Sequence, residues 1–110
     1  MERLLRDLRE ELKAIFSERL KGIYLYGSYA RGTADSESDV DVLVVLDLIE
    51  RYGVEIDRTS HFVADLSLAH GVSVSRVFVD EATWLSGDTW FLRNVREEAR
   101  LCDERSFQTE

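Results

Sequence analysis

The chain has 110 residues and no proline, with 45% hydrophobic and 33% charged residues, a composition typical of one soluble globular domain and not of a disordered chain. Its formal net charge of −8 argues against direct nucleic-acid binding, because phosphate backbones select basic surfaces. No apolar run approaches the roughly 18 residues that a membrane-spanning helix needs, so we expect no membrane association.

The amino-terminal segment and the cysteine content indicate the compartment. Residues 1–16 (MERLLRDLREELKAIF) are charged throughout and lack the apolar core of a signal peptide. Cys102 is the only cysteine, so no internal disulfide can form, which is typical of the reducing cytoplasm. We therefore expect a cytoplasmic protein with a single domain over residues 1–110. A domain of this size buries a limited share of its surface, which favours a stabilising partner or a homodimer.

The first half of the chain predicts one helix and two strands. Leucine, isoleucine and phenylalanine recur at helical spacing from residue 2 to about 19, and Gly22 is expected to end this helix. An apolar run over residues 23–26 predicts a short strand, and the run over residues 40–46 predicts a second, buried strand.

The second half continues the alternation of helices and strands. After a connection over residues 47–54 with Gly53 in it, apolar residues at helical spacing predict a helix over residues 57–70, which Gly71 ends. The β-branched run VSVSRVFV at residues 72–79 predicts a third strand.

The carboxy-terminal part predicts two more helical segments and an edge strand. A short turn of helix is expected over residues 80–84, and a last helix, capped by Asp88 or Thr89, runs to about Ala99. Residues 100–103 are expected to add an edge strand before a polar tail that begins at Glu104. The fold class is thus α/β (α+β), a small mixed sheet of about four strands with helices packed against it.

The most informative stretch lies between the first two predicted strands, at residues 27–41 (GSYARGTADSESDVD). A Gly-Ser turn at Gly27-Ser28, a short helix at residues 29–31 and a polar loop lead to Asp39 and Asp41. Carboxylates at positions i and i+2 of a strand point to the same face. Such a pair on an apolar strand is costly unless a cation lies between its members, and Mg²⁺ prefers oxygen ligands.

The Gly-Ser turn and Arg31 suit a phosphate that this metal would bridge. Gly27 lets the backbone approach an anion, Ser28 offers a hydroxyl and an amide, and Arg31 supplies a fixed positive charge. The structural alternatives are a capping acid at a solvated strand start for Asp39 and Asp41, a plain turn residue for Ser28, and a salt bridge from Arg31 to Asp35 or Glu37.

Residues 27–41 resemble the signature of the DNA polymerase β-like nucleotidyltransferase superfamily, and the whole chain resembles its minimal nucleotidyltransferase (MNT) branch. FLRNVREEARLC at residues 91–102 also resembles the ending of these small proteins. The resemblance implies the polymerase β-like fold, ATP as substrate, Mg²⁺ as cofactor, Asp39 and Asp41 as catalytic metal ligands, and Gly27, Ser28 and Arg31 as nucleotide-binding residues. Many members accompany a HEPN-domain ribonuclease toxin. For these the resemblance implies an antitoxin that forms a hetero-oligomer with the toxin and transfers AMP to one of its tyrosines.

One departure from the family pattern concerns the third carboxylate that members usually add from a later strand. The third predicted strand has Ser73, Ser75 and Arg76 where that acid would be sought. Asp80, at the end of this strand, is the nearest acid; its alternative role is to cap the following helix. The alternative function is therefore a weak or inactive nucleotidyltransferase-fold antitoxin that neutralises its partner by forming a complex. Transfer to a small molecule is disfavoured, because such enzymes usually carry an additional helical domain.

Overall fold

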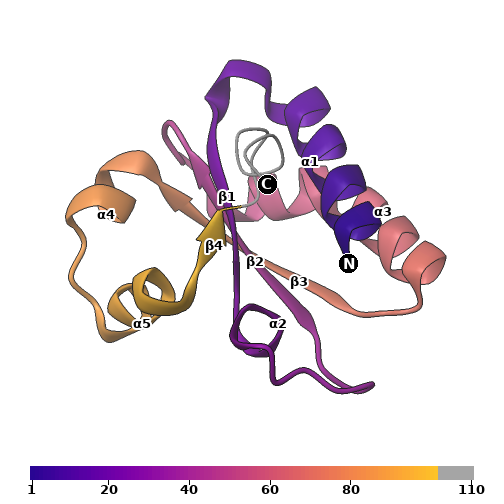
Figure 1. Cartoon of the computed structure of the whole chain (residues 1–110). Coiled ribbons are helices and arrows are strands. Elements are labelled where there is room, and N and C mark those ends of the chain that lie inside the picture. Colours follow the sequence, from indigo (N-terminus) through magenta and orange to yellow (C-terminus); the bar gives the residue numbers. More distant parts are fainter. Residues whose placement is uncertain (102–110) are drawn as a thin grey trace.

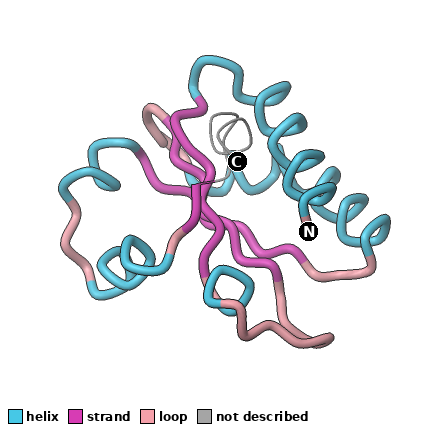
Figure 2. Tube along the Cα trace, viewed as in Figure 1, coloured by secondary structure: helices cyan, strands magenta, loops and turns pink. Residues whose placement is uncertain are grey.

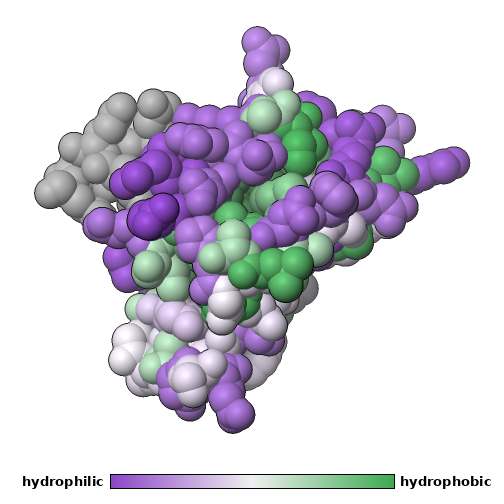
Figure 3. All heavy atoms as spheres, turned by 90° about the vertical axis from the view of Figure 1, so that its right-hand side faces the viewer, coloured by the Kyte–Doolittle hydropathy of each residue, from purple (hydrophilic) through white to green (hydrophobic). Residues whose placement is uncertain are grey.

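The computed structural model describes residues 1–101 and shows helices on both faces of a central sheet (Figure 1). Helices α1 (Glu2–Phe16) and α3 (Tyr52–His70) cover one face. Helices α4 (Glu81–Ser86) and α5 (Trp90–Glu98) lie on the opposite side (Figure 2). Figure 3 shows the outer side of the α1–α3 layer, where hydrophilic side chains surround a central strip of hydrophobic ones.

Within residues 1–101 the sheet has four strands in the order β3-β2-β1-β4, which confirms the predicted mixed sheet. Strand β1 (Leu20–Tyr26) is antiparallel to β2 (Val40–Leu46) and to the two-residue strand β4 (Arg100–Leu101). Strand β2 is parallel to β3 (Val74–Asp80), and α3 makes the crossover between them. The predicted bounds of β2 are those observed.

Strand β2 is the centre of the hydrophobic core because both of its faces are covered. Val42 and Val44 pack in the cluster beneath α1 and α3, whereas Leu43 and Val45 pack in a second cluster with Val95 of α5. A strand buried on both faces is apolar along its whole length. Only Asp41 interrupts this run, and the alternation places it on the α5 side of the sheet, together with Leu43.

The amino-terminal helix ends earlier than the sequence predicted. Helix α1 stops at Phe16, and the residues that follow form a short 3₁₀-helix, η1 (Ser17–Arg19). The prediction that Gly22 ends the helix was wrong, since Gly22 lies inside β1. The chain turns at Ser17, which has a φ of 52°, and the strand then begins at once because Leu20 pairs with Leu46 of β2.

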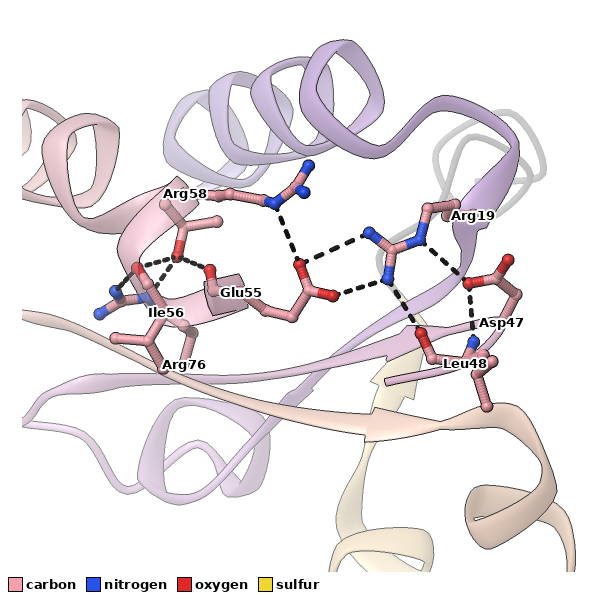
Figure 4. Close-up of polar contacts among 8 residues, drawn as sticks. Arg19, Asp47, Leu48, Glu55, Ile56, Arg58 and Arg76 are labelled. Carbon is pink, nitrogen blue, oxygen red and sulfur yellow. Dashed lines mark hydrogen bonds and ion pairs between the residues drawn. The ribbon is translucent and has the colours of Figure 1, made fainter. Parts of the chain in front are cut away.

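Helix α3 starts five residues before the predicted residue 57, so Gly53 lies in the helix and not in a connection. The reason is tertiary. Glu55, in the first turn, is 4% exposed, and its Oε2 accepts a hydrogen bond of 2.6 Å from Nη2 of Arg19 (Figure 4). This contact, with a partner 36 residues away, stabilises a first turn that the local pattern does not favour. Gly71 ends the helix with a φ of 66°, as predicted.

The remaining elements agree closely with the expected order. Strand β3 is shifted by one or two residues from the predicted 72–79. Thr89 caps α5, accepting a hydrogen bond of 3.2 Å from the Leu92 N–H, which decides between the two predicted caps. The other residues of the predicted edge strand, 102–103, and the tail from Glu104 lie outside the described residues. Within residues 1–101 no helix has the length and apolarity to span a membrane.

Candidate functional site

The residues singled out in the stretch 27–41 meet where β1 ends and β2 begins. Tyr26, the last residue of β1, lies opposite Asp41 in the antiparallel register. Gly27 follows and caps a four-residue helix, α2 (Ser28–Arg31), which lies at the lower end of β1 in Figure 1. The chain then returns through the polar loop to Asp39, directly before β2. The structure therefore brings the Gly-Ser turn, Arg31 and the acids to one end of the sheet.

Gly27 lies directly against the Asp41 carboxylate. Its φ of 78° and ψ of −157° belong to a region that only glycine populates readily. A Cβ built on Gly27 would be 2.2 Å from Oδ2 of Asp41, closer than any such contact allows. Glycine is thus required here both by the backbone conformation and by the approach of the carboxylate.

Gly27→Ala is expected to destabilise the fold by more than Gly32→Ala. Gly32 also has a φ of 78°, but no atom lies within 4 Å of the position that a Cβ would take there, so its cost is only the left-handed conformation, roughly 1–2 kcal/mol. Gly27→Ala adds the clash with Asp41 to a strain of about 1–3 kcal/mol. Urea titrations of both variants measure the difference. Equal losses of stability would contradict the close approach of the Asp41 carboxylate.

Asp39 and Asp41 form an electrostatically unfavourable pair. The pKa of Asp41 is raised above its ordinary value, first because the carboxylate is partly buried and then because Asp39 is near. Arg31 acts in the opposite direction, and Glu98 adds to the rise. An excess of negative charge that one arginine does not balance fits a divalent cation held by carboxylate oxygens.

The donor set fits Mg²⁺ that retains other ligands. Within residues 1–101 no group of three or more His, Cys, Asp or Glu side chains is arranged to hold a metal ion. Asp39 and Asp41 would supply two carboxylates, and Mg²⁺ usually binds proteins through one or two carboxylates while keeping waters and substrate phosphates. The residues present thus suit a metal that arrives with a phosphorylated substrate.

The register of β3 shows which of its residues lies beside Asp41. Ser75 pairs with Asp41 on the neighbouring parallel strand, so both side chains lie on the same face of the sheet. Arg76 points to the other face, where its Nε donates a hydrogen bond of 2.9 Å to Thr59 and its Nη2 one of 2.8 Å to the Ile56 carbonyl (Figure 4).

The structure contradicts Asp80 as the third acid of this site. Asp80 pairs with Leu46, five positions beyond the pair of Ser75 and Asp41, or about 16 Å along the strand. Its side chain accepts a hydrogen bond of 2.9 Å from the Thr83 N–H and caps α4, the alternative that the sequence allowed.

The sequence did not reveal Glu98, the last residue of α5. Its Oε1 accepts a hydrogen bond of 2.9 Å from the Gly27 N–H, and its Oε2 accepts one of 2.9 Å from Nη1 of Arg31. These two hydrogen bonds hold the pKa of Glu98 below its ordinary value, and the bond from Gly27 has the larger effect. Arg31 thus pairs with Glu98 and not with Asp35 or Glu37. No local pattern indicates this contact, because 71 residues separate Glu98 from Gly27.

The other end of the sheet carries a hollow of about 350 Å³ whose charged residues largely pair with one another. Arg19 donates to Asp47 at 3.2 Å and to the Leu48 carbonyl at 2.9 Å, besides Glu55 (Figure 4). Arg58 approaches the same Glu55 at 3.5 Å. This network ties η1, the end of β2 and the start of α3 together, so we interpret it as structural.

Comparison with known proteins agrees with this geometry. The model of the nucleotidyltransferase domain family matches residues 5–102. Over 101 residues the chain is 35% identical to the candidate protein adenylyltransferase MJ0604 of Methanocaldococcus jannaschii, a match that covers 91% of this chain and 95% of the relative.

Solved structures share the fold at lower identity. A toxin–antitoxin structure with AMP-PNP is 21% identical, with a TM-score of 0.59 and coverage of 98% of this chain and 78% of that chain. The structure of a tri-AMPylated Shewanella oneidensis HEPN toxin in complex with an MNT antitoxin is 20% identical, with a TM-score of 0.52 and coverage of 99% and 78%. The matched family model and the archaeal relative show that this chain belongs to the nucleotidyltransferase domain family and is a nucleotidyltransferase-like enzyme.

Proposed function

We propose that this protein is a Mg²⁺-dependent adenylyltransferase of the cytoplasm that transfers AMP from ATP to a tyrosine hydroxyl of a HEPN-type toxin and thereby acts as its antitoxin. The observation that carries the proposal is the meeting of Gly27, Arg31 and Asp41 at one end of the sheet. The archaeal relative is described as a candidate protein adenylyltransferase, and two structures with this fold are toxin–antitoxin structures, one with AMP-PNP and one with an AMPylated toxin.

The reaction forms one P–O bond and breaks another, and the acceptor hydroxyl loses its proton to solvent. The acceptor hydroxyl oxygen bonds to the α-phosphorus of ATP, the bond from that phosphorus to the oxygen bridging to the β-phosphate breaks, and pyrophosphate leaves. When bound, Mg²⁺ supplies charge neutralisation at the phosphates. Asp39 and Asp41 would hold it, while Arg31 and the hydroxyl and amide of Ser28 would bind the leaving phosphates. The site has no third carboxylate at position 75 to take the hydroxyl proton, so the acidity of a phenol favours tyrosine over aliphatic hydroxyls.

A transfer assay tests the proposal. The purified protein and the toxin encoded beside it are incubated with Mg²⁺ and ATP labelled at the α-phosphate. We expect label on the toxin, none when EDTA is added, and none with Asp39→Ala plus Asp41→Ala. Absence of label with the native protein, or label that persists with the double variant, would refute the catalytic function.

A second candidate function is neutralisation by complex formation alone. Two observations favour it: the residue paired with Asp41 on β3 is Ser75 and not an acid, and the apolar side chains of Leu85 and Trp90 are 74% and 76% exposed, as is typical of protein-binding surfaces. In this case the double aspartate variant still neutralises the toxin. A variant that keeps the complex but loses neutralisation would count against this candidate.

A further inference from the structure

Glu98 makes contacts that the transfer reaction itself does not require. We propose that Glu98 is a positioning residue that holds Arg31 and the Gly27 turn in the geometry that binds the phosphates of Mg²⁺-ATP. This inference rests on the proposed function, because it concerns the same nucleotide. It assigns a role in the site to the carboxyl-terminal end of α5.

The fold places Glu98 rigidly at the edge of β1. Leu92 and Val95 anchor α5 in the core, with exposures of 4% and 2%. Immediately after the helix, Arg100 pairs with Leu25 of β1. The Glu98 carboxylate accepts a hydrogen bond from the N–H of Gly27, the residue that follows β1. A side chain of α5 therefore extends the hydrogen bonding along this edge of β1.

The second oxygen of Glu98 orients Arg31. The Arg31 side chain is 50% exposed, and a long exposed side chain samples many rotamers unless a partner holds it. Within residues 1–101, the Arg31 side chain donates one hydrogen bond, from Nη1 to Glu98. The guanidinium has further donors in a fixed plane, so Nε and Nη2 stay available for a phosphate.

Two other roles for Glu98 fit the geometry less well. Because both carboxylate oxygens accept strong hydrogen bonds and the pKa of Glu98 is lowered, it is a poor general base and does not replace the missing third acid. Glu98 would instead compete with phosphate if Arg31 had to break its ion pair with Glu98 in order to bind nucleotide. Glu98 occupies only Nη1 of the guanidinium, so Arg31 can bind phosphate through its other nitrogens without leaving Glu98.

The sign of one affinity change separates positioning from competition. If Glu98 positions Arg31, Glu98→Ala weakens Mg²⁺-ATP binding about tenfold, as is common for residues that orient ligating groups. If Glu98 competes with phosphate, the same change tightens binding. Glu98→Gln keeps an oxygen for the Gly27 N–H but loses the charge, so an intermediate loss is expected. Glu97→Ala, an exposed neighbour on the same helix, is the matched control.

The test is isothermal titration of Mg²⁺-ATP into the native protein, Glu98→Ala, Glu98→Gln, Glu97→Ala, Arg31→Ala and the double variant Arg31→Ala plus Glu98→Ala. Positioning through Arg31 predicts that Glu98→Ala has little further effect once Arg31 is removed. Without nucleotide, Glu98→Ala is also expected to speed hydrogen exchange of the Gly27 amide, and Glu97→Ala is not.

The outcomes distinguish a failure of the positioning role from a failure of the proposed function. Unchanged or tighter binding by Glu98→Ala, or full additivity with Arg31→Ala, overturns the positioning role and leaves the proposed function standing. A native protein that binds no Mg²⁺-ATP overturns the proposed function and this role together. Unchanged exchange of the Gly27 amide in Glu98→Ala overturns the contact on which the role depends.

Discussion

Replacing Asp41 by asparagine is expected to reduce AMP transfer steeply and, in the absence of metal, to raise the melting temperature of the same protein. The loss of the metal ligand proposed above is expected to remove several kcal/mol of transition-state stabilisation, a fall in rate on the order of 10³-fold. The gain in stability follows from the raised pKa of Asp41, which shows that the folded protein disfavours the charged carboxylate.

The pH dependence of this effect has a definite sign. The ordinary pKa of the carboxylate is 3.8, and the folded value lies above it. Between the two values the folded state binds more protons than the unfolded state, so Asp41 makes the protein less stable as the pH rises through this window. Above the folded pKa the penalty is complete. Mg²⁺ bound as proposed would relieve this penalty, so metal is expected to raise the melting temperature of the native protein at neutral pH.

Thermal unfolding from pH 4 to pH 8, with and without Mg²⁺, checks these expectations. Asp41→Asn should melt higher than the native protein without metal and should respond less to Mg²⁺. Asp65→Asn, on α3 and 67% exposed, is a charge-matched control that leaves the Mg²⁺ response intact. If Asp41→Asn melts lower than the native protein without metal at pH 7, the excess of negative charge at this site does not exist.

Replacing Ser75 by aspartate is expected to increase both Mg²⁺ affinity and the transfer rate. The new carboxylate would stand on the same face as Asp41 and one strand away. A carboxylate that accepts the proton of the attacking hydroxyl contributes about 10²-fold or more to the rate. Without metal the same change should lower the melting temperature, because a third negative charge joins Asp39 and Asp41.

The measurements are single-turnover transfer rates and Mg²⁺ titrations of the native protein and Ser75→Asp. Ser86→Asp places an equal charge on α4, beyond the far end of β3, and is expected to change neither quantity. A Ser75→Asp protein that binds Mg²⁺ more tightly but transfers no faster would show that the reaction needs no general base at this position. No change in either quantity would contradict the register-based assignment of Ser75.

The sequence alone predicted most of the fold, because its information was local. The apolar spacing of α1, the unbroken run of β2 and the left-handed glycine after α3 each depend on a few neighbouring residues. The information in the stretch 27–41 is local too, since a Gly-Ser turn, an arginine and two acids stand within fifteen positions of one chain segment. For this reason the candidate site was predicted before any contact was known.

The tertiary structure decided what depends on distant partners. The early start of α3 follows from the buried pair of Arg19 and Glu55, which no local pattern contains. The parallel register of β2 and β3 sets Ser75 beside Asp41 and places Asp80 five positions further along the strand. This placement was not predictable, because a register cannot be inferred from either strand by itself. Glu98 reached Gly27 and Arg31 only because α5 and β4 fold back along the edge of β1, and side-chain contacts across 71 residues require the folded chain.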